Sequence, residues 1–218
     1  MFIPLTTHSA SLIFKSSVTA KTSTGKTQMP TELPKSFRRN VLGAYPNGAA
    51  WLDSLSALVA GCEERWHIVA QPPFELSYSY VAPATSTTGR EVVLKLGVPN
   101  AELSSEIKAL QAYDGSGAVR LLDFDAERGF LLLERATPGD NLATLNDDER
   151  ATRIAANLMR ALWRPLPNNG SFPATAQWAD GLGRLRKTFD GRTGPFARRL
   201  VEMAESFFVE LHASAEPP

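Results

Sequence analysis

The chain has 218 residues, 43% of them hydrophobic, which is enough for a substantial core, and its 23 basic residues balance its 23 acidic residues. This lack of net charge disfavours nucleic acid and anionic membranes as partners, and no run approaches the roughly 20 apolar residues that span a bilayer. The single cysteine, Cys62, excludes an internal disulfide, and no cysteine and histidine cluster has zinc-ligand spacing, so we expect a globular protein of the cytoplasm.

The first 30 residues differ in composition from the rest of the chain. Serine and threonine dominate them, and their only charges are Lys15, Lys21 and Lys26. This composition predicts a disordered N-terminal extension over residues 1–30. Met29 stands directly before the first segment typical of folded protein, so it is an alternative to Met1 as the start of translation.

An amphipathic helix is predicted from Gly48 onward. Its apolar residues recur at helical spacing, and the charged residues fall largely off that stripe. Cys62 is interpreted as a small buried hydrophobic residue, because nothing basic shares its face. The stripe consists of Trp51, Leu55, Leu58, Val59, Cys62 and Trp66.

After Pro72-Pro73 the pattern becomes rich in strands. Turn residues join two pairs of strands into hairpins, and Asp114-Gly115 ends the helix that lies between the pairs. The predicted elements are strands over residues 76–84 and 91–96 joined by the turn 86–89, a helix over 102–113, and strands over 119–124 and 130–134 joined by 125–129.

Beyond Pro138-Gly139 the pattern is helical. Asn146 is predicted to be an N-cap with Glu149 at the third helical position, and Pro165 is predicted to end that helix and begin a loop to Pro173. Further helices are predicted over residues 178–189 and 195–211. The order of elements indicates an α+β chain, with a mixed part followed by a helical part. The last helix is predicted to turn Phe196, Leu200, Met203, Phe207 and Leu211 inward.

Lys95 is the first candidate for a functional residue. It lies in a predicted strand whose neighbours on both faces are apolar, an unusual place for an ammonium group without a role. Glu106 follows eleven residues later on a predicted helix, and its position in the middle of that helix favours it over Glu102 as the partner of Lys95. A strand lysine fixed by a helical carboxylate is the arrangement that binds nucleotide phosphates in protein kinases.

Two further segments are candidates for contacts with a nucleotide. Ser77 and Ser79 belong to a turn that would lie over the phosphates through small side chains and backbone amides, although an ordinary start of a strand explains them equally well. Glu134 and Ala136 flank the link to the helical part, where a hinge would offer backbone groups to the edge of an adenine.

Seven segments carry a resemblance to a known family: Pro34-Lys-Ser-Phe-Arg-Arg-Asn-Val41, Ser77-Tyr-Ser-Tyr-Val-Ala-Pro83, Val93-Leu-Lys-Leu-Gly-Val-Pro-Asn100, Glu106-Ile-Lys-Ala-Leu110, Gly117-Ala-Val-Arg-Leu-Leu122, Leu131-Leu-Leu-Glu-Arg135 and Ala151-Thr-Arg-Ile-Ala-Ala156. Together they resemble the aminoglycoside/hydroxyurea antibiotic resistance kinases, the family of streptomycin phosphotransferases, from about Met29 to the C-terminus. The resemblance implies a protein-kinase-like (aminoglycoside phosphotransferase-like) fold, with a small lobe at 31–136 and the start of a helical lobe at 137–218. It also implies transfer of a phosphoryl group from ATP to a hydroxyl of a small antibiotic. By the resemblance Lys95 binds phosphate and Glu106 is its ion-pair partner.

The sequence departs from this family at its C-terminal end. Family members continue after a helix like the last one into a His-Gly-Asp loop, whose aspartate is the general base, and then into asparagine and aspartate ligands for Mg²⁺. Here the sequence runs from His212 to Pro218 without such a segment, and neither Asp180 nor Asp190 stands in a matching context. We therefore expect no catalytic base and no metal ligand in these residues, and no useful kinase activity of this truncated chain alone.

Three interpretations remain open from the sequence. The chain is the N-terminal portion of a small-molecule kinase, or a non-catalytic module that binds nucleotide, or a non-functional gene fragment. In the last case Phe196, Met203, Phe207 and Phe208 should be partly exposed as an apolar patch. The sequence does not separate streptomycin, another aminoglycoside and hydroxyurea as the substrate, and no pattern in it indicates an oligomeric state.

Overall fold

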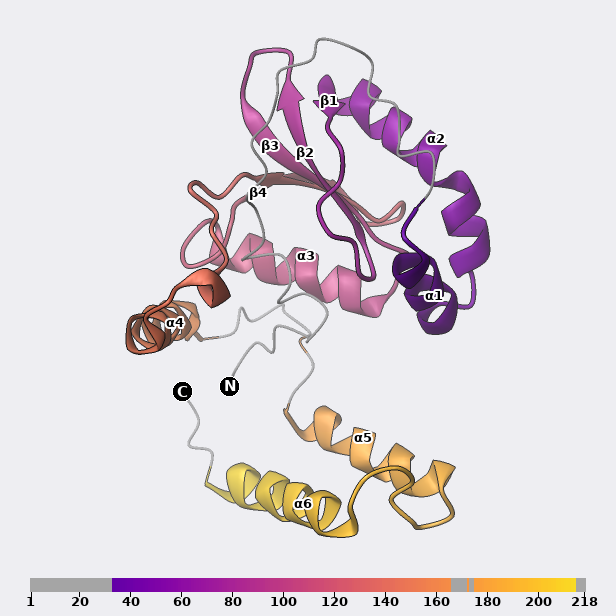
Figure 1. Cartoon of the computed structure of the whole chain (residues 1–218), viewed down its shortest axis with the longest axis vertical. Coiled ribbons are helices and arrows are strands. Elements are labelled where there is room, and N and C mark those ends of the chain that lie inside the picture. The colour runs from indigo at the N-terminus through magenta and orange to yellow at the C-terminus, as the bar shows by residue number, and fades with distance from the viewer. Residues whose placement is uncertain (1–32, 166–171, 173–174, 215–218) are drawn as a thin grey trace. The chain divides into compact units, whose positions relative to one another are not determined.

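A computed structural model describes residues 33–165, 172 and 175–214 (Figure 1). The predicted disordered extension, the alternative start at Met29 and most of the loop predicted between Pro165 and Pro173 lie outside these residues. The chain divides into two compact units, and the division falls between Leu162 and Trp163. The lobe boundary after residue 136 stays a prediction, because the helix that follows it belongs to the same compact unit as the sheet.

The first unit contains two helices, a five-stranded sheet with a helix between its strands, and one further helix (Figure 1). All strand pairs are antiparallel, and the order across the sheet is β1-β2-β3-β5-β4. The α+β class is therefore confirmed. The elements are α1 (Lys35–Ala44), α2 (Gly48–Trp66), β1 (Ile68–Ala70), β2 (Tyr80–Ser86), β3 (Glu91–Leu96), α3 (Ala101–Tyr113), β4 (Leu121–Asp125), β5 (Phe130–Glu134), the 3-10 helix η2 (Leu142–Thr144) and α4 (Asp148–Leu162).

The central strand β3 separates two hydrophobic clusters. Because side chains alternate along a strand, Val92, Leu94 and Leu96 pack into a cluster that includes buried residues of α1 and α2. Val93 faces the other cluster, which α3 and β5 build from Leu103, Ile107, Leu131 and Leu133. Lys95 is two residues from Val93 and so lies on the side of the sheet that α3 covers.

The contact between α1 and α2 depends on a glycine. Phe37 and Val41 of α1 are fully buried, and the Phe37 ring meets the ring of Trp51 edge to face with 6.3 Å between centroids. A Cβ atom on Gly48 would lie 2.6 Å from the Val41 carbonyl oxygen, so only glycine lets the two helices approach this closely. The predicted stripe of α2 is confirmed, since Trp51, Leu55 and Val59 are buried with Cys62 while Leu58 and Trp66 are half-buried.

Three elements of the first unit differ from the sequence prediction. The sequence analysis did not predict α1 or β1, because α1 has only one short apolar stripe and β1 has only three residues. The strand predicted from residue 76 begins at Tyr80. Residues 77–79 form bends instead, and the backbone N–H of Phe74 already donates to the Val81 carbonyl at 2.9 Å.

The N-cap of α4 is Asp147 and not Asn146 as predicted. The Asp147 carboxylate accepts a hydrogen bond from the backbone N–H of Arg150 at 2.9 Å, and its carbonyl accepts from Ala151. An ionised carboxylate at this position is also favoured by the helix dipole. Glu149 is therefore the second helical residue and pairs with Arg153.

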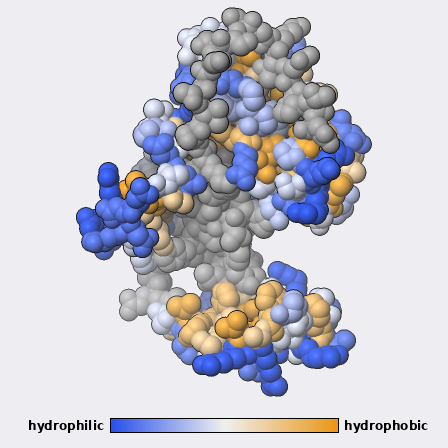
Figure 2. All heavy atoms as spheres, viewed as in Figure 1, coloured by the Kyte–Doolittle hydropathy of each residue, from blue (hydrophilic) through white to orange (hydrophobic). Residues whose placement is uncertain are grey.

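The second unit contains α5 (Thr175–Thr188) and α6 (Arg198–Ala213), which pack on each other. The inward face predicted for the last helix is wrong. Val201 is its buried residue and Phe208 is half-buried, and these two lie on a different side of α6 from the predicted stripe. The predicted residues form an exposed apolar row (Figure 2), in which the exposed fractions are 57% for Phe196, 63% for Leu200, 40% for Met203, 52% for Phe207 and 67% for Leu211.

The buried thiol of Cys62 supports a first prediction. Burial is the main cause that raises the pKa of Cys62 from 9.0 to about 12, and the nearby guanidinium of Arg65 lowers it by less. The folded chain should therefore not react with a disulfide reagent at pH 8, whereas the chain in urea should release one equivalent. Rapid reaction of the folded chain would contradict the packing described here.

The same thiol makes stability depend on pH. Above pH 9.0 the unfolded thiol loses its proton while the folded one keeps it up to about pH 12. Since the folded state binds more protons in that range, its stability should fall as the pH rises. A Cys62→Ala variant should lose less stability between pH 8 and pH 10 than the wild type, as measured by unfolding in urea.

Candidate functional site

Lys95 lies in the middle of the sheet. Its β3 position pairs with Val81 of β2 on one side and with Leu131 of β5 on the other. Only 2% of the residue is exposed, although it carries a charge. An isolated ammonium would be strongly destabilised in these surroundings, so its partner determines whether the site is stable.

That partner is Glu106 of α3. The Lys95 ammonium donates to both carboxylate oxygens, over 2.6 Å to Oε1 and 2.7 Å to Oε2, and only 10% of the Glu106 side chain is exposed. Such short, charge-assisted hydrogen bonds are the strong class. They occupy two of the three ammonium donors and hold the group in a single orientation.

The start of α3 explains why Glu106 reaches the lysine. The Asn100 side chain accepts from the backbone N–H of Leu103 at 2.9 Å and so caps the helix, and Leu103 and Ile107 anchor it on the sheet. Glu106 precedes Ile107 and projects toward β3. Glu102, the competing candidate, makes no contact with Lys95, and its buried Oε1 has no hydrogen-bond partner among the described residues.

The loop between β1 and β2 contains Ser77 and Ser79, both half-buried. The Ser77 carbonyl accepts a hydrogen bond from Asn40 Nδ2 over 3.2 Å. The Ser79 hydroxyl oxygen lies 3.5 Å from the position that a Cβ atom of Gly97 would occupy, two residues beyond Lys95. Ser79 is therefore close to the lysine end of β3, and Ser77 lies against α1.

Glu134 and Ala136 lie at the other end of β3. Glu134 pairs with Val92, three residues or about 10 Å from Lys95 along the strand. The Glu134 carboxylate is already used, because it accepts from the backbone N–H of Arg120 at 3.2 Å. Ala136 is exposed in the segment that follows β5. The structure thus separates this pair from the serines and from the Lys95–Glu106 ion pair.

No group of three potential metal ligands occurs in the part of the chain that the structure describes. The described helices also include none that is long and apolar enough to cross a membrane. Among the ion pairs of the described residues, Lys95–Glu106 is the most buried, with 3% and 10% of the two side chains exposed.

Sequence reasoning missed Asn40 and Tyr45 as neighbours of the site. Asn40 contacts the loop as described above, and the Tyr45 side chain shares a hydrogen bond with Asn100, the cap of α3. Burial and the nearby Glu102 carboxylate raise the pKa of Tyr45, so its hydroxyl stays protonated at neutral pH. Neither residue belongs to a recognisable motif, since both contacts depend on how α1 packs.

The chain is similar in sequence to a family of kinases and to named relatives. A family model described as aminoglycoside/hydroxyurea antibiotic resistance kinase matches residues 65–216. The streptomycin 6-kinase of Streptomyces griseus is 35% identical over 135 residues, which cover 62% of this chain and 43% of that protein. The hydroxyurea phosphotransferase of Kitasatospora aureofaciens is 39% identical over 118 residues, which cover 53% of this chain and 35% of that protein. The matched part of the chain thus covers less than half of either relative, and no solved structure matches.

Proposed function

Because the chain belongs to the aminoglycoside/hydroxyurea antibiotic resistance kinase family, we propose that it forms the nucleotide-holding part of an ATP-dependent small-molecule phosphotransferase. The observation that carries this proposal is the buried ion pair of Lys95 and Glu106, with contacts of 2.6 and 2.7 Å. In protein kinases a lysine on the third strand and a glutamate on the following helix hold the phosphates in this way. The five-stranded antiparallel sheet is consistent with the protein-kinase-like fold that we propose for this unit.

Each group of the site has a proposed task. Lys95 neutralises charge on the nucleotide phosphates, and Glu106 keeps the ammonium oriented toward them. Ser77 and Ser79 bring backbone amides and small side chains to the phosphates, and the backbone at Glu134 and Ala136 meets the edge of the adenine. Bound ATP would supply the phosphoryl group that is transferred.

Because Lys95 is buried, ATP can reach its ammonium group only if the surrounding side chains move. Only 3% of the Lys95 side chain is exposed, so a phosphate reaches the ammonium after the side chains that cover it have moved. Binding of ATP therefore includes a local rearrangement around β3 and α3. Such a rearrangement lowers the apparent affinity, because part of the binding free energy offsets it.

We propose an antibiotic hydroxyl as the phosphate acceptor, on the model of the relatives named streptomycin 6-kinase and hydroxyurea phosphotransferase. The cytoplasm is the proposed compartment, in keeping with the unpaired Cys62. The described residues contain no cluster suited to Mg²⁺, so we assign no step to a metal in this part of the protein.

The test is ATP binding and ATP turnover by the purified chain. We expect calorimetry to detect binding of ATP, and a coupled assay for ADP to detect no turnover when streptomycin or hydroxyurea is added. The printed sequence contains no His-Gly-Asp segment for the general base, which is the reason for expecting binding without transfer. Antibiotic-dependent release of ADP would contradict the expected inactivity, and a failure to bind ATP would contradict the proposed function itself.

A further inference from the structure

The C-terminal half of α1 touches two parts of the proposed nucleotide site. Asn40, in its second turn, donates from Nδ2 to the Ser77 carbonyl across 37 residues of sequence. Tyr45, the residue that ends α1, shares a side-chain hydrogen bond with Asn100 at the start of α3. One short helix therefore contacts both the loop between β1 and β2 and the helix that bears Glu106.

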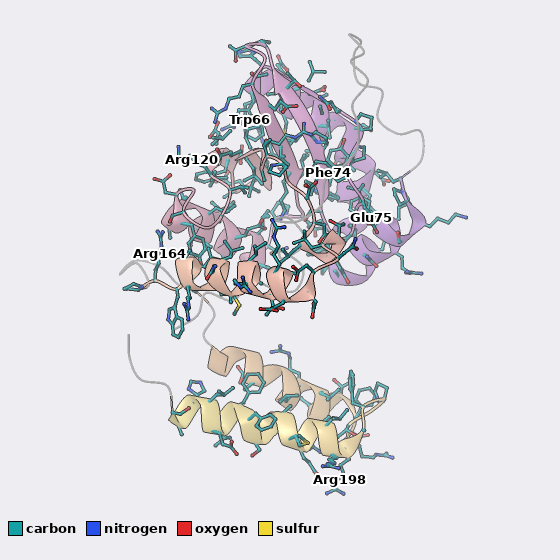
Figure 3. The ribbon with its side chains drawn as sticks, turned by 60° about the vertical axis from the view of Figure 1, so that its left-hand side comes forward. Trp66, Phe74, Glu75, Arg120, Arg164 and Arg198 are labelled. Carbon is teal, nitrogen blue, oxygen red and sulfur yellow. The ribbon has the colours of Figure 1, made fainter. Side chains whose placement is uncertain are left out.

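The contact from Asn40 lies beyond the base of the loop. At the base its backbone joins β2, since Gln71 donates to the Pro83 carbonyl at 2.7 Å and Phe74 donates to the Val81 carbonyl at 2.9 Å. After Phe74, which Figure 3 labels together with Glu75, the loop leaves β2 until the strand starts at Tyr80. The hydrogen bond from Asn40 falls within this stretch, at the first of the two candidate serines.

The helix that supplies the contact is itself firmly held. Phe37 and Val41, which lie on either side of Asn40, have no exposed surface. The Val41 carbonyl is packed so closely against Gly48 that no Cβ atom fits between them. Leu76 of the loop belongs to the same buried cluster as Phe37 and Val41. A rigid helix that presents a fixed amide donor can hold a loop in one position at little entropic cost.

The hydroxyl of Tyr45 lies among polar groups of α3. Besides the hydrogen bond with Asn100, the carboxylates of Glu102 and Glu106 raise the pKa of the hydroxyl, Glu102 more strongly than Glu106. Asn100 also accepts from the Leu103 backbone N–H, so the tyrosine contact supports the residue that caps α3. A fixed cap in turn fixes the direction of the helix on which Glu106 stands.

We propose that α1 acts as a strut, in which Asn40 and Tyr45 are positioning residues that hold the phosphate-side loop against the start of α3. The inference rests on the proposed function, because the positioned groups are those that would meet the nucleotide. It concerns residues outside the family match, which begins at residue 65. In this arrangement α1 connects the loop between β1 and β2 to the start of α3, and α1 does not itself contact ATP.

Asn40→Asp tests the first contact. The aspartate keeps the shape of the side chain but has no N–H to donate, so the fold should survive while Ser77 loses its partner. We expect hydrogen exchange of residues 71–79 to become about tenfold faster and the affinity for ATP, measured by calorimetry, to fall about fivefold, the effect of one lost hydrogen bond. The matched control is Leu42→Ala, because Leu42 is 50% exposed on the same helix.

Tyr45→Phe tests the second contact by removing only the hydroxyl. We expect faster exchange in the first turn of α3 and a further weakening of ATP binding, while the urea midpoint stays close to that of the wild type. A purely structural role would instead shift the urea midpoint and leave exchange at the loop and at α3 changed no more than elsewhere.

The outcomes separate the two proposals. If exchange of the loop is the same in Asn40→Asp as in Leu42→Ala, the strut is overturned whatever happens to ATP. Faster exchange with an unchanged affinity for ATP overturns the positioning role. If the wild type binds no ATP, the proposed function is overturned, and exchange still decides whether α1 holds the loop.

Discussion

Lys95→Met is expected to weaken ATP binding by about 10- to 100-fold, the range for losing a hydrogen bond to a charged group. Methionine has nearly the same length and fills the same apolar slot between Val81 and Leu131. The change therefore removes the charge with little loss of packing. Calorimetric titration with ATP measures the effect, and Lys108→Met, at an exposed lysine on α3, is the matched control that should leave the affinity unchanged.

The same substitution should also destabilise the chain. It leaves the Glu106 carboxylate with only 10% of its side chain exposed and without its main partner, and loss of one member of a buried pair costs about 3 kcal/mol or more. The double variant Lys95→Met with Glu106→Gln should recover much of this stability, because no buried charge remains. It should not recover ATP binding.

This combination distinguishes a functional ion pair from a structural one. If the double variant regained both stability and affinity, the lysine would have no direct role with the phosphates. Equal affinity of the wild type and Lys95→Met would also contradict the proposed function. Urea unfolding and ATP titration on the same four proteins therefore decide the matter.

Gly129→Ala is expected to destabilise the chain by about 3 kcal/mol, from strain at positive φ and a backbone clash together. Gly129 has φ of +78°, and a Cβ atom there would lie 2.1 Å from the carbonyl oxygen of Gly97. The Gly97 N–H also donates to the Gly129 carbonyl at 2.9 Å. This contact joins the end of β3, two residues from Lys95, to the hairpin of β4 and β5.

Gly89 provides the matched control for this prediction. It has a nearly equal φ of +81°, but no atom lies within 4 Å of its Cβ position. Gly89→Ala should therefore lower the free energy of unfolding only by the cost of placing alanine at positive φ, about 1 kcal/mol. The difference between the two variants in urea unfolding isolates the clash with Gly97. Equal costs would show that the contact between Gly97 and Gly129 contributes nothing to stability.

Much of the first unit could be predicted from the sequence, because strong local signals act there. A continuous apolar run around Lys95, turn residues at Gly89 and Gly129, and the stop signal at Asp114-Gly115 all favour the same hairpins and helix. The spacing of Lys95 and Glu106 then follows, since α3 comes directly after β3. The structure brings these two residues together and keeps Glu134 and Ala136 about 10 Å or more away along the sheet.

The features that sequence reasoning missed depend on tertiary packing. The contact of Asn40 with Ser77 spans 37 residues and needs the close approach of α1 and α2 at Gly48. The three residues of β1 are too few for a periodic signal. On α6 the periodicity correctly indicated a helix with an apolar row, but it could not tell which side packs on α5. Val201 and Phe208, on another side, are the more buried residues.

The uneven distribution of buried side chains has a consequence for how the chain responds to heat. Among the described residues both hydrophobic clusters lie in the first unit, whereas the second unit buries Phe172 and Val201 and leaves the apolar row of α6 exposed. The enthalpy of melting follows buried surface, so we expect most of the calorimetric signal of the described residues to come from the unit with the sheet. We therefore expect the melting enthalpy per residue, averaged over the 218 residues, to fall below that of a single cooperative domain of this length.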